Sequence, residues 1–123
     1  MTRVFVYGSL LRGEPNHGLL VAARFIGRAH TRPMFALHDL GAFPGVVSNG
    51  TTAIAGEIYE VDGLTLERLD RLEGHPHLYR REVVELVTDE GNELAYIYVY
   101  VASLGRARPI SSGDWREHKE QLR

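Results

Sequence analysis

Two stretches of this sequence combine residue types that bind substrates and move protons. The first is Tyr7-Gly8-Ser9-Leu10, which follows a short apolar run near the N-terminus. A strand that runs into a glycine-containing polar loop can aim several backbone N–H groups at one point, which is a common way to hold a small anion or an oxyanion. The alternative is an ordinary tight turn after a buried strand. We interpret the loop as a substrate-binding element.

Glu73 is the candidate for proton transfer. It follows leucines spaced every three residues and directly precedes Gly74-His75-Pro76, where a helix is expected to end. A carboxylate at such a junction can lie at the mouth of a cleft, partly desolvated, so that its pKa rises toward the value that suits a general acid–base. The alternative is a surface glutamate in the last helical turn, because most glutamates are exposed.

The first stretch matches neither of two familiar motifs, the phosphate-binding loop and the nucleophilic serine elbow. Gly8 and Gly13 have the spacing of a phosphate-binding loop, but Glu14 stands where that motif requires lysine. Ser9 lacks the glycines that flank the nucleophilic serine of a G-x-S-x-G elbow. The backbone N–H groups of Gly8, Ser9 and Leu10 therefore fit the chemistry better than the Ser9 hydroxyl does.

The sequence offers little for a metal site. His75 and His77 flank Pro76, but zinc sites use three or four protein ligands, and the other histidines follow no common spacing. The absence of cysteine excludes a thiolate nucleophile, a disulfide and a cysteine-bound metal. We predict that no metal is bound.

The composition limits the class of protein. A chain of 123 residues with 44% hydrophobic and 24% charged residues is expected to form one domain over residues 1–123. Its 14 basic and 16 acidic residues give a net charge of -2, which argues against a nucleic-acid partner. The apolar runs are far shorter than the ~20 residues that cross a bilayer, and the first is too short for a signal peptide. We expect a cytoplasmic protein without a membrane partner.

The elements that must position these residues follow from the hydrophobic pattern. Six segments have strand character: residues 3–7, 24–30, 34–38, 53–61, 82–88 and 93–102. Two short helices are expected at residues 16–23 and 63–72, with Asn16 capping the first and Asp62 or Thr65 capping the second. The connections are short. We therefore predict an α+β fold whose mostly antiparallel sheet curls into a barrel-like core.

Side-chain alternation assigns two further features. Ile58 should face away from Tyr59 and Val61, and the last strand should carry Tyr96, Tyr98 and Tyr100 on one face. Such a row of tyrosines usually packs against neighbouring strands, but one of its members could line a pocket. Near the C-terminus, Trp115 follows a turn and is expected to pack back onto the body.

Several motifs occur together in one order along nearly the whole chain: Val6-Tyr7-Gly8-Ser9-Leu10, Phe43-Pro44-Gly45, Gly56-Glu57-Ile58-Tyr59, Glu73-Gly74-His75-Pro76-His77-Leu78-Tyr79-Arg80-Arg81 and Tyr98-Val99-Tyr100. Together they resemble the γ-glutamylcyclotransferase-like family. The Y-G-S/T-L start is similar to the family signature, and the E-x-x-P-x-x-Y-x-R stretch resembles the branch that acts on γ-glutamylamines.

The resemblance implies a six-stranded β-barrel with short flanking helices, and a reaction that converts a γ-glutamyl amide to 5-oxoproline with release of the free amine. It implies that Tyr7–Leu10 binds the glutamyl part and that Glu73 is the catalytic residue. Tyr79 and Tyr100 are candidates for further hydrogen bonds to the substrate. No cofactor is expected, and the partner would be a small γ-glutamyl compound bound by a monomer or a small homo-oligomer.

Two other functions remain open at this point. A non-catalytic module of the same fold could bind γ-glutamyl compounds or small carboxylates, although a pure binder of an acidic ligand gains nothing from a nearby Glu73. An amide hydrolase could use Glu73 to activate water. The three functions differ in their product, which is 5-oxoproline, none or free glutamate.

Overall fold

The computed structural model describes residues 1–123 and contains eight strands, two α-helices and one 3₁₀ helix. In chain order these are β1 (Thr2–Val6), the 3₁₀ helix η1 (His17–Leu20), β2 (Arg24–Thr31), β3 (Phe35–Asp39), β4 (Pro44–Ser48), β5 (Ala55–Val61), α1 (Gly63–Glu73), β6 (Tyr79–Thr88), β7 (Gly91–Tyr100), β8 (Arg108–Pro109) and α2 (Trp115–Gln121).

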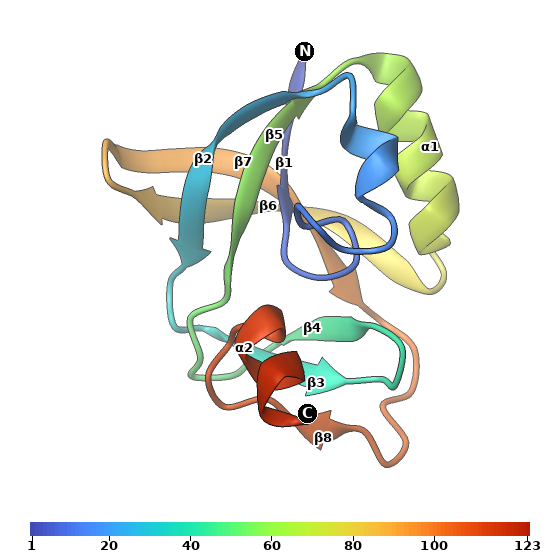
Figure 1. The fold of residues 1–123 in the computed structure, drawn as a ribbon, viewed down its shortest axis with the longest axis vertical. Coiled ribbons are helices and arrows are strands. Elements are labelled where there is room, and N and C mark those ends of the chain that lie inside the picture. Colours follow the sequence, from blue (N-terminus) through green and yellow to red (C-terminus); the bar gives the residue numbers. More distant parts are fainter.

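The sheet closes on itself at β1. Its strand order is β1-β5-β2-β6-β7-β4-β3-β8, and β1 also pairs with β7, so that β1, β5, β2, β6 and β7 form a closed barrel. The pairings are antiparallel except that β7 runs parallel to both β1 and β4. The three remaining strands extend from β7 and lie below the barrel with α2 (Figure 1). The predicted α+β class with a mostly antiparallel barrel is confirmed.

The strand count differs from the prediction. All six expected strands are present, but the closed barrel has five of them because β3 belongs to the extension. β4 and β8 were not predicted. Pro44 and Gly45 mark β4 as a break in the sequence pattern, yet this segment forms a strand because β3 pairs with it on one side and β7 on the other. β8 has only two residues and no local signal.

The apolar residues form two layers. One cluster includes Phe5, Ile58 and Ile97, and the other includes Tyr59, Val61 and Tyr98, as the predicted alternation along β5 and β7 requires. The second cluster also includes buried leucines of η1 and α1. These two helices cover this side of the barrel (Figure 1). The site described below lies where this layer ends.

The helix α1 has clear local signals at both ends. The Asp62 side chain accepts a hydrogen bond from the Thr65 amide at 2.7 Å, which confirms Asp62 as the N-cap residue. Gly74 ends the helix in the left-handed conformation with φ of 65°, where glycine carries no steric penalty. Leu69, on the inner face of α1, is fully buried in the second cluster. The cap at Gly74 fixes where Glu73, the last helical residue, lies.

The other helices differ from their predictions. The first is the short 3₁₀ helix η1, and the Asn16 side chain does not cap it but donates a hydrogen bond to the Ser9 hydroxyl. Trp115 is buried as expected, at the start of α2, whose N-cap is Asp114. None of these helices has the length and apolar character that crossing a bilayer requires.

Candidate active site

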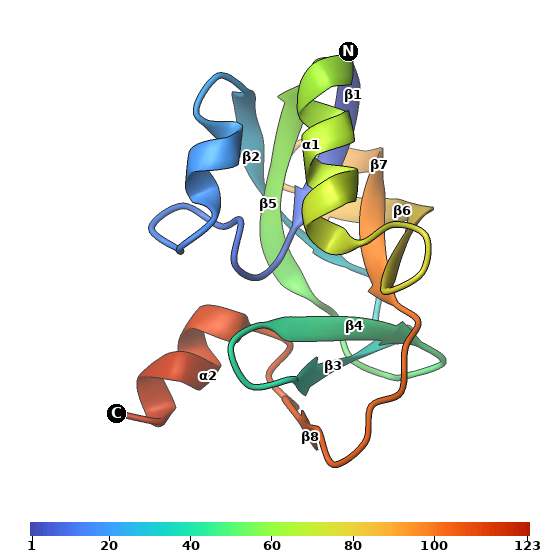
Figure 2. The same ribbon diagram turned by 90° about the vertical axis from the view of Figure 1, so that its right-hand side faces the viewer.

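A pocket of about 150 Å³ opens where the end of β1, the end of α1 and the start of β4 meet. Figure 2 shows the C-terminal end of α1 facing β4. The pocket is lined by Phe5, Val6, Tyr7, Gly8, Ser9, Leu10, Asn16, Phe43, Pro44, Leu72, Glu73, Leu78, Tyr79 and Tyr98. The structure therefore brings Tyr7–Leu10, Glu73 and Tyr79 together at one place, although about sixty residues of sequence separate the loop from Glu73.

The loop offers unused hydrogen-bond donors to this pocket. The backbone N–H groups of Gly8, Ser9 and Leu10 donate no hydrogen bond to another protein group. Gly8 is required here by packing, because a Cβ atom at this position would lie 2.6 Å from Cγ of Pro44. The Ser9 hydroxyl accepts a hydrogen bond of 3.0 Å from Asn16 Nδ2. Three consecutive free amides are an arrangement that suits a carboxylate or an oxyanion.

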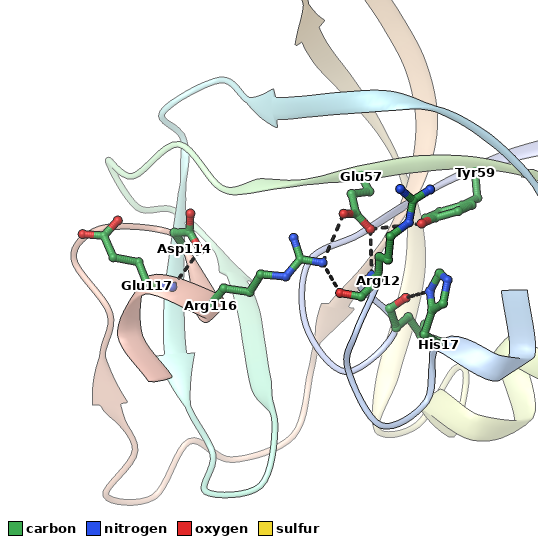
Figure 3. Close-up of polar contacts among 8 residues, drawn as sticks. Arg12, His17, Glu57, Tyr59, Asp114, Arg116 and Glu117 are labelled. Carbon is green, nitrogen blue, oxygen red and sulfur yellow. Dashed lines mark hydrogen bonds and ion pairs between the residues drawn. The ribbon is translucent and has the colours of Figure 1, made fainter. Parts of the chain in front are cut away.

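The loop is held from behind by a buried carboxylate, Glu57 (Figure 3). Glu57 is 3% exposed, and its Oε1 atom accepts hydrogen bonds from the Arg12 amide at 3.0 Å and the Tyr59 hydroxyl at 3.1 Å. Its Oε2 atom pairs with Nη2 of Arg116 at 3.2 Å, and the same guanidinium also donates to the carbonyl of Arg12. His17 Nδ1 donates to the Leu10 carbonyl at 2.9 Å. The loop is thus fixed by α2, β5 and η1.

The environment of Glu57 keeps it charged. Burial alone would raise its pKa, but the hydrogen bond from the Arg12 amide and the charge of Arg116 outweigh burial, so the pKa lies below its usual value. We did not predict a role for Glu57 from the sequence. The sequence does contain a signal for such a role: in β5, Glu57 is a charged residue on the same face as Tyr59 and Val61, which is otherwise apolar.

Glu73 is half-buried in the pocket, and its side chain forms no hydrogen bond with another protein group. Burial raises the pKa of its carboxyl group to about 7. A group with this pKa exists in both protonation states near neutral pH, so it can accept a proton at one step and return it at another. Glu73 therefore has the environment that the sequence interpretation required of a general acid–base.

The tyrosines of the pocket are largely committed to backbone partners. The Tyr7 hydroxyl donates to the Tyr98 carbonyl at 2.7 Å and accepts from the Val46 amide at 3.1 Å. The Tyr79 hydroxyl donates to the Pro44 carbonyl at 2.8 Å. Burial raises the pKa of both phenols, so both are neutral. Tyr7 therefore joins β1, β7 and β4, while Tyr79 can offer the pocket a lone pair rather than a proton.

Tyr100, which we named as a candidate substrate ligand, is not part of this pocket lining. Its hydroxyl is 3.3 Å from the Ser103 carbonyl, and its ring packs edge-on against Tyr79 with centroids 5.1 Å apart. Tyr98, on the same face of β7, lines the pocket instead. The alternation therefore places Tyr98 at this pocket, and the role of Tyr100 in substrate binding stays a prediction.

An ion pair fixes the end of α1 that carries Glu73. Arg81 Nε and Nη2 donate to the two oxygens of Asp70 at 2.6 and 3.1 Å, and the Tyr98 hydroxyl donates to Asp70 Oδ1 at 2.7 Å. His75 Nδ1 accepts a hydrogen bond of 3.0 Å from the Arg81 amide. These contacts join α1, the following turn, β6 and β7. No group of three or more histidine, aspartate or glutamate side chains is arranged to hold a metal ion.

Comparison with known proteins places the chain in a family. The family model for gamma-glutamyl cyclotransferase, AIG2-like, matches residues 4–117. A Vibrio cholerae protein named as a candidate gamma-glutamylcyclotransferase is 46% identical over 112 residues, with 91% of this chain and 93% of that protein covered. A Methanocaldococcus jannaschii protein with the same designation is 43% identical over 122 residues, covering 97% of this chain and 99% of that protein.

The fold is shared with a solved relative. The crystal structure of a mouse AIG2-like protein superposes with a TM-score of 0.80 at 29% identity, covering 93% of this chain and 88% of the mouse chain. The sequence match over residues 4–117 includes both the loop after β1 and Glu73. The chain belongs to the gamma-glutamyl cyclotransferase, AIG2-like family.

Proposed function

We propose that this protein is a cyclotransferase that converts a γ-glutamyl amine or amide to 5-oxoproline and releases the free amine. One observation carries the proposal: the carboxyl group of Glu73, with a pKa of about 7, lines the same small pocket as the free amides of Gly8, Ser9 and Leu10. The designations of the bacterial and archaeal relatives agree with this class of reaction.

The reaction needs few protein groups because both reactants belong to one molecule. The α-amino nitrogen of the glutamyl group attacks its own γ-carbonyl carbon, a C–N bond closes the five-membered ring, and the C–N bond to the leaving amine breaks. Holding the chain in a folded conformation supplies much of the acceleration, since well-oriented intramolecular reactions reach effective molarities of about 10⁵–10⁸ M. No oxidant, reductant or second substrate is consumed.

Glu73 is assigned the proton transfers. Its carboxylate takes a proton from the α-ammonium group, which frees the nitrogen lone pair for attack. The carboxylic acid so formed then gives that proton to the nitrogen of the leaving amine. The attacking nitrogen loses its second proton as the lactam forms, and the released amine takes up a proton to leave as an ammonium ion, so Glu73 ends each cycle as it began. General acid–base assistance of this kind contributes roughly 10²–10⁴-fold.

The loop amides are assigned to the negative charge. The substrate has a permanent α-carboxylate, and its γ-carbonyl oxygen becomes an oxyanion as the ring closes. The free N–H groups of Gly8–Leu10 can donate to either group. The pocket of about 150 Å³ is compact, as binding a glutamyl group requires.

The direct test is incubation with a panel of γ-glutamylamines that includes γ-glutamyl-ε-lysine, followed by detection of 5-oxoproline and the free amine in equal amounts. Release of 5-oxoproline supports the proposal. Free glutamate in its place would indicate a hydrolase, and binding of the panel without any product would indicate a non-catalytic binding module.

A further inference from the structure

A second and larger pocket, of about 430 Å³, lies next to the candidate active site. Its lining is Asp39, Leu40, Phe43, Leu78, Tyr100, Ser103, Leu104, Arg106 and Ala107. Phe43 and Leu78 line both pockets, so the two hollows share a border. The far side of the second pocket comes from the segment that joins β7 to β8.

The border between the pockets is apolar and open. Phe43 and Leu78 are 39% and 38% exposed, which is high for large apolar side chains beside a pocket. The ring of Tyr79 lies between Phe43, at a centroid distance of 6.5 Å, and Tyr100, at 5.1 Å. A substrate that fills the first pocket with its glutamyl group and continues across this border would cover the two exposed side chains. Its aliphatic part would then lie in the second pocket.

Two charged side chains line the second pocket, and only one of them is free to bind a ligand. Asp39 is already paired, because its Oδ1 atom accepts a hydrogen bond of 2.8 Å from the Gly41 amide and its Oδ2 atom lies 2.8 Å from His118 Nε2. Arg106 is exposed and has neither an ion pair nor a side-chain hydrogen bond. The charge that the pocket offers to a ligand is therefore positive.

We propose that the second pocket is the subsite for the leaving amine and that Arg106 selects leaving amines with an aliphatic chain ending in a carboxylate. This assignment rests on the proposed cyclotransferase function, because it places the scissile amide at the border formed by Phe43 and Leu78. A guanidinium suits this role because its planar donors match a carboxylate.

The experiment uses pairs of γ-glutamyl amides that differ only in the far end of the leaving amine. One member carries an ω-aminoalkanoic acid of three to six carbons, and the other carries the n-alkylamine of the same length. The measured quantity is the ratio of kcat/KM for the acid to kcat/KM for the alkylamine. Since Arg106 is exposed, we expect the kcat/KM for the acid to exceed that for the alkylamine by about two- to fivefold at the best-fitting length.

The variants decide whether Arg106 causes the preference. Arg106→Gln should bring the ratio close to one. Arg28→Gln is the matched control, because Arg28 is also exposed and unpaired but lines neither pocket, and it should keep the ratio of the unmodified protein. A ratio near one in the unmodified protein at every length, or a preference that persists in Arg106→Gln, would overturn the assignment.

Binding separates this assignment from the reaction itself. Calorimetric titration of the Glu73→Gln variant with the same pairs measures the preference without turnover. Tighter binding of the acids that disappears in Glu73→Gln/Arg106→Gln supports the subsite even if no 5-oxoproline is ever formed, in which case the proposed function alone fails. Turnover of both members without any preference overturns the subsite and leaves the proposed function intact.

Discussion

The backbone amide of Arg12 donates a hydrogen bond of 3.0 Å to the carboxylate of Glu57, forty-five residues further along the chain. This contact links the loop after β1 to a buried group of β5 that does not touch the pocket. The loop amides can remain unpaired toward the pocket because Glu57, Arg116 and His17 hold the loop by its other groups. The binding element is therefore preorganised from behind.

Removing the Glu57 carboxylate should destabilise the fold and loosen the loop. Glu57→Ala leaves the Arg12 amide, the Tyr59 hydroxyl and the Arg116 guanidinium without their shared acceptor. We expect a loss of roughly 2–4 kcal/mol in the free energy of unfolding, together with a higher KM. Urea denaturation measures the free energy of unfolding, and steady-state kinetics measures KM. Glu60→Ala, which removes from the same strand a partly exposed carboxylate that pairs with Arg3 and Arg24, should cost less than about 1 kcal/mol, and equal losses would refute the role of Glu57.

Adding one carbon at Gly8 should displace the loop. The Cβ atom of Gly8→Ala would lie 2.6 Å from Cγ and 2.7 Å from Cδ of Pro44, so either the loop or β4 must move. We expect a stability loss of about 1–3 kcal/mol and a lower kcat/KM. Gly18→Ala is the control, because its added carbon meets no atom within 4 Å. Kinetics and thermal melting of the two variants should differ clearly.

Replacing Tyr7 by phenylalanine tests whether this residue is structural. The variant leaves the Val46 amide without its acceptor in a buried place and removes the donor to the Tyr98 carbonyl. The free energy of unfolding should fall by about 1–3 kcal/mol. Tyr96→Phe, whose hydroxyl has no protein partner, should change it little. If Tyr7→Phe is as stable as Tyr96→Phe, the hydroxyl does not hold the three strands together.

The raised pKa of Glu73 makes a prediction about stability. Its carboxyl group has a pKa of about 7 in the folded protein and 4.5 as the ordinary value, so the unfolded chain loses this proton at lower pH. Between pH 4.5 and 7 the folded state binds more protons, and stability therefore falls as the pH rises. The Glu73→Gln variant lacks this loss and should gain up to about 3 kcal/mol relative to the unmodified protein between pH 4 and pH 8.

The control for that titration is Glu67→Gln, because Glu67 is an exposed residue of the same helix. Its stability should follow that of the unmodified protein at every pH. Parallel stability curves for Glu73→Gln and the unmodified protein would show that burial does not shift the Glu73 carboxyl group.

Local signals made much of the architecture predictable. The alternation of apolar side chains placed Ile58 and Tyr59 on opposite faces of β5, and Asp62 and Gly74 marked the two ends of α1. These features depend on residues within a few positions of each other, so one sequence is enough to identify them. The conjunction of the loop at Gly8 with Glu73 was instead anticipated from the resemblance to a family.

Features created by long-range pairing were not predictable. β4 is a strand only because β3 and β7 flank it, while its own Pro44 and Gly45 indicate a turn. The role of Glu57 was not predictable because its partners, the Arg12 amide and the Arg116 guanidinium, are far away in the sequence. The Tyr98 hydroxyl likewise finds its partner, Asp70, only when the fold brings α1 and β7 together.

The rate of 5-oxoproline formation by Glu73→Gln tests the central claim most directly. It should be measured against pH with a γ-glutamylamine that the unmodified protein converts, and with Glu67→Gln as the control. We expect kcat to fall by at least ~10²-fold in Glu73→Gln, and kcat/KM of the unmodified protein to rise through a pKa of about 7 as the carboxylate forms. An unchanged rate in Glu73→Gln would contradict the account.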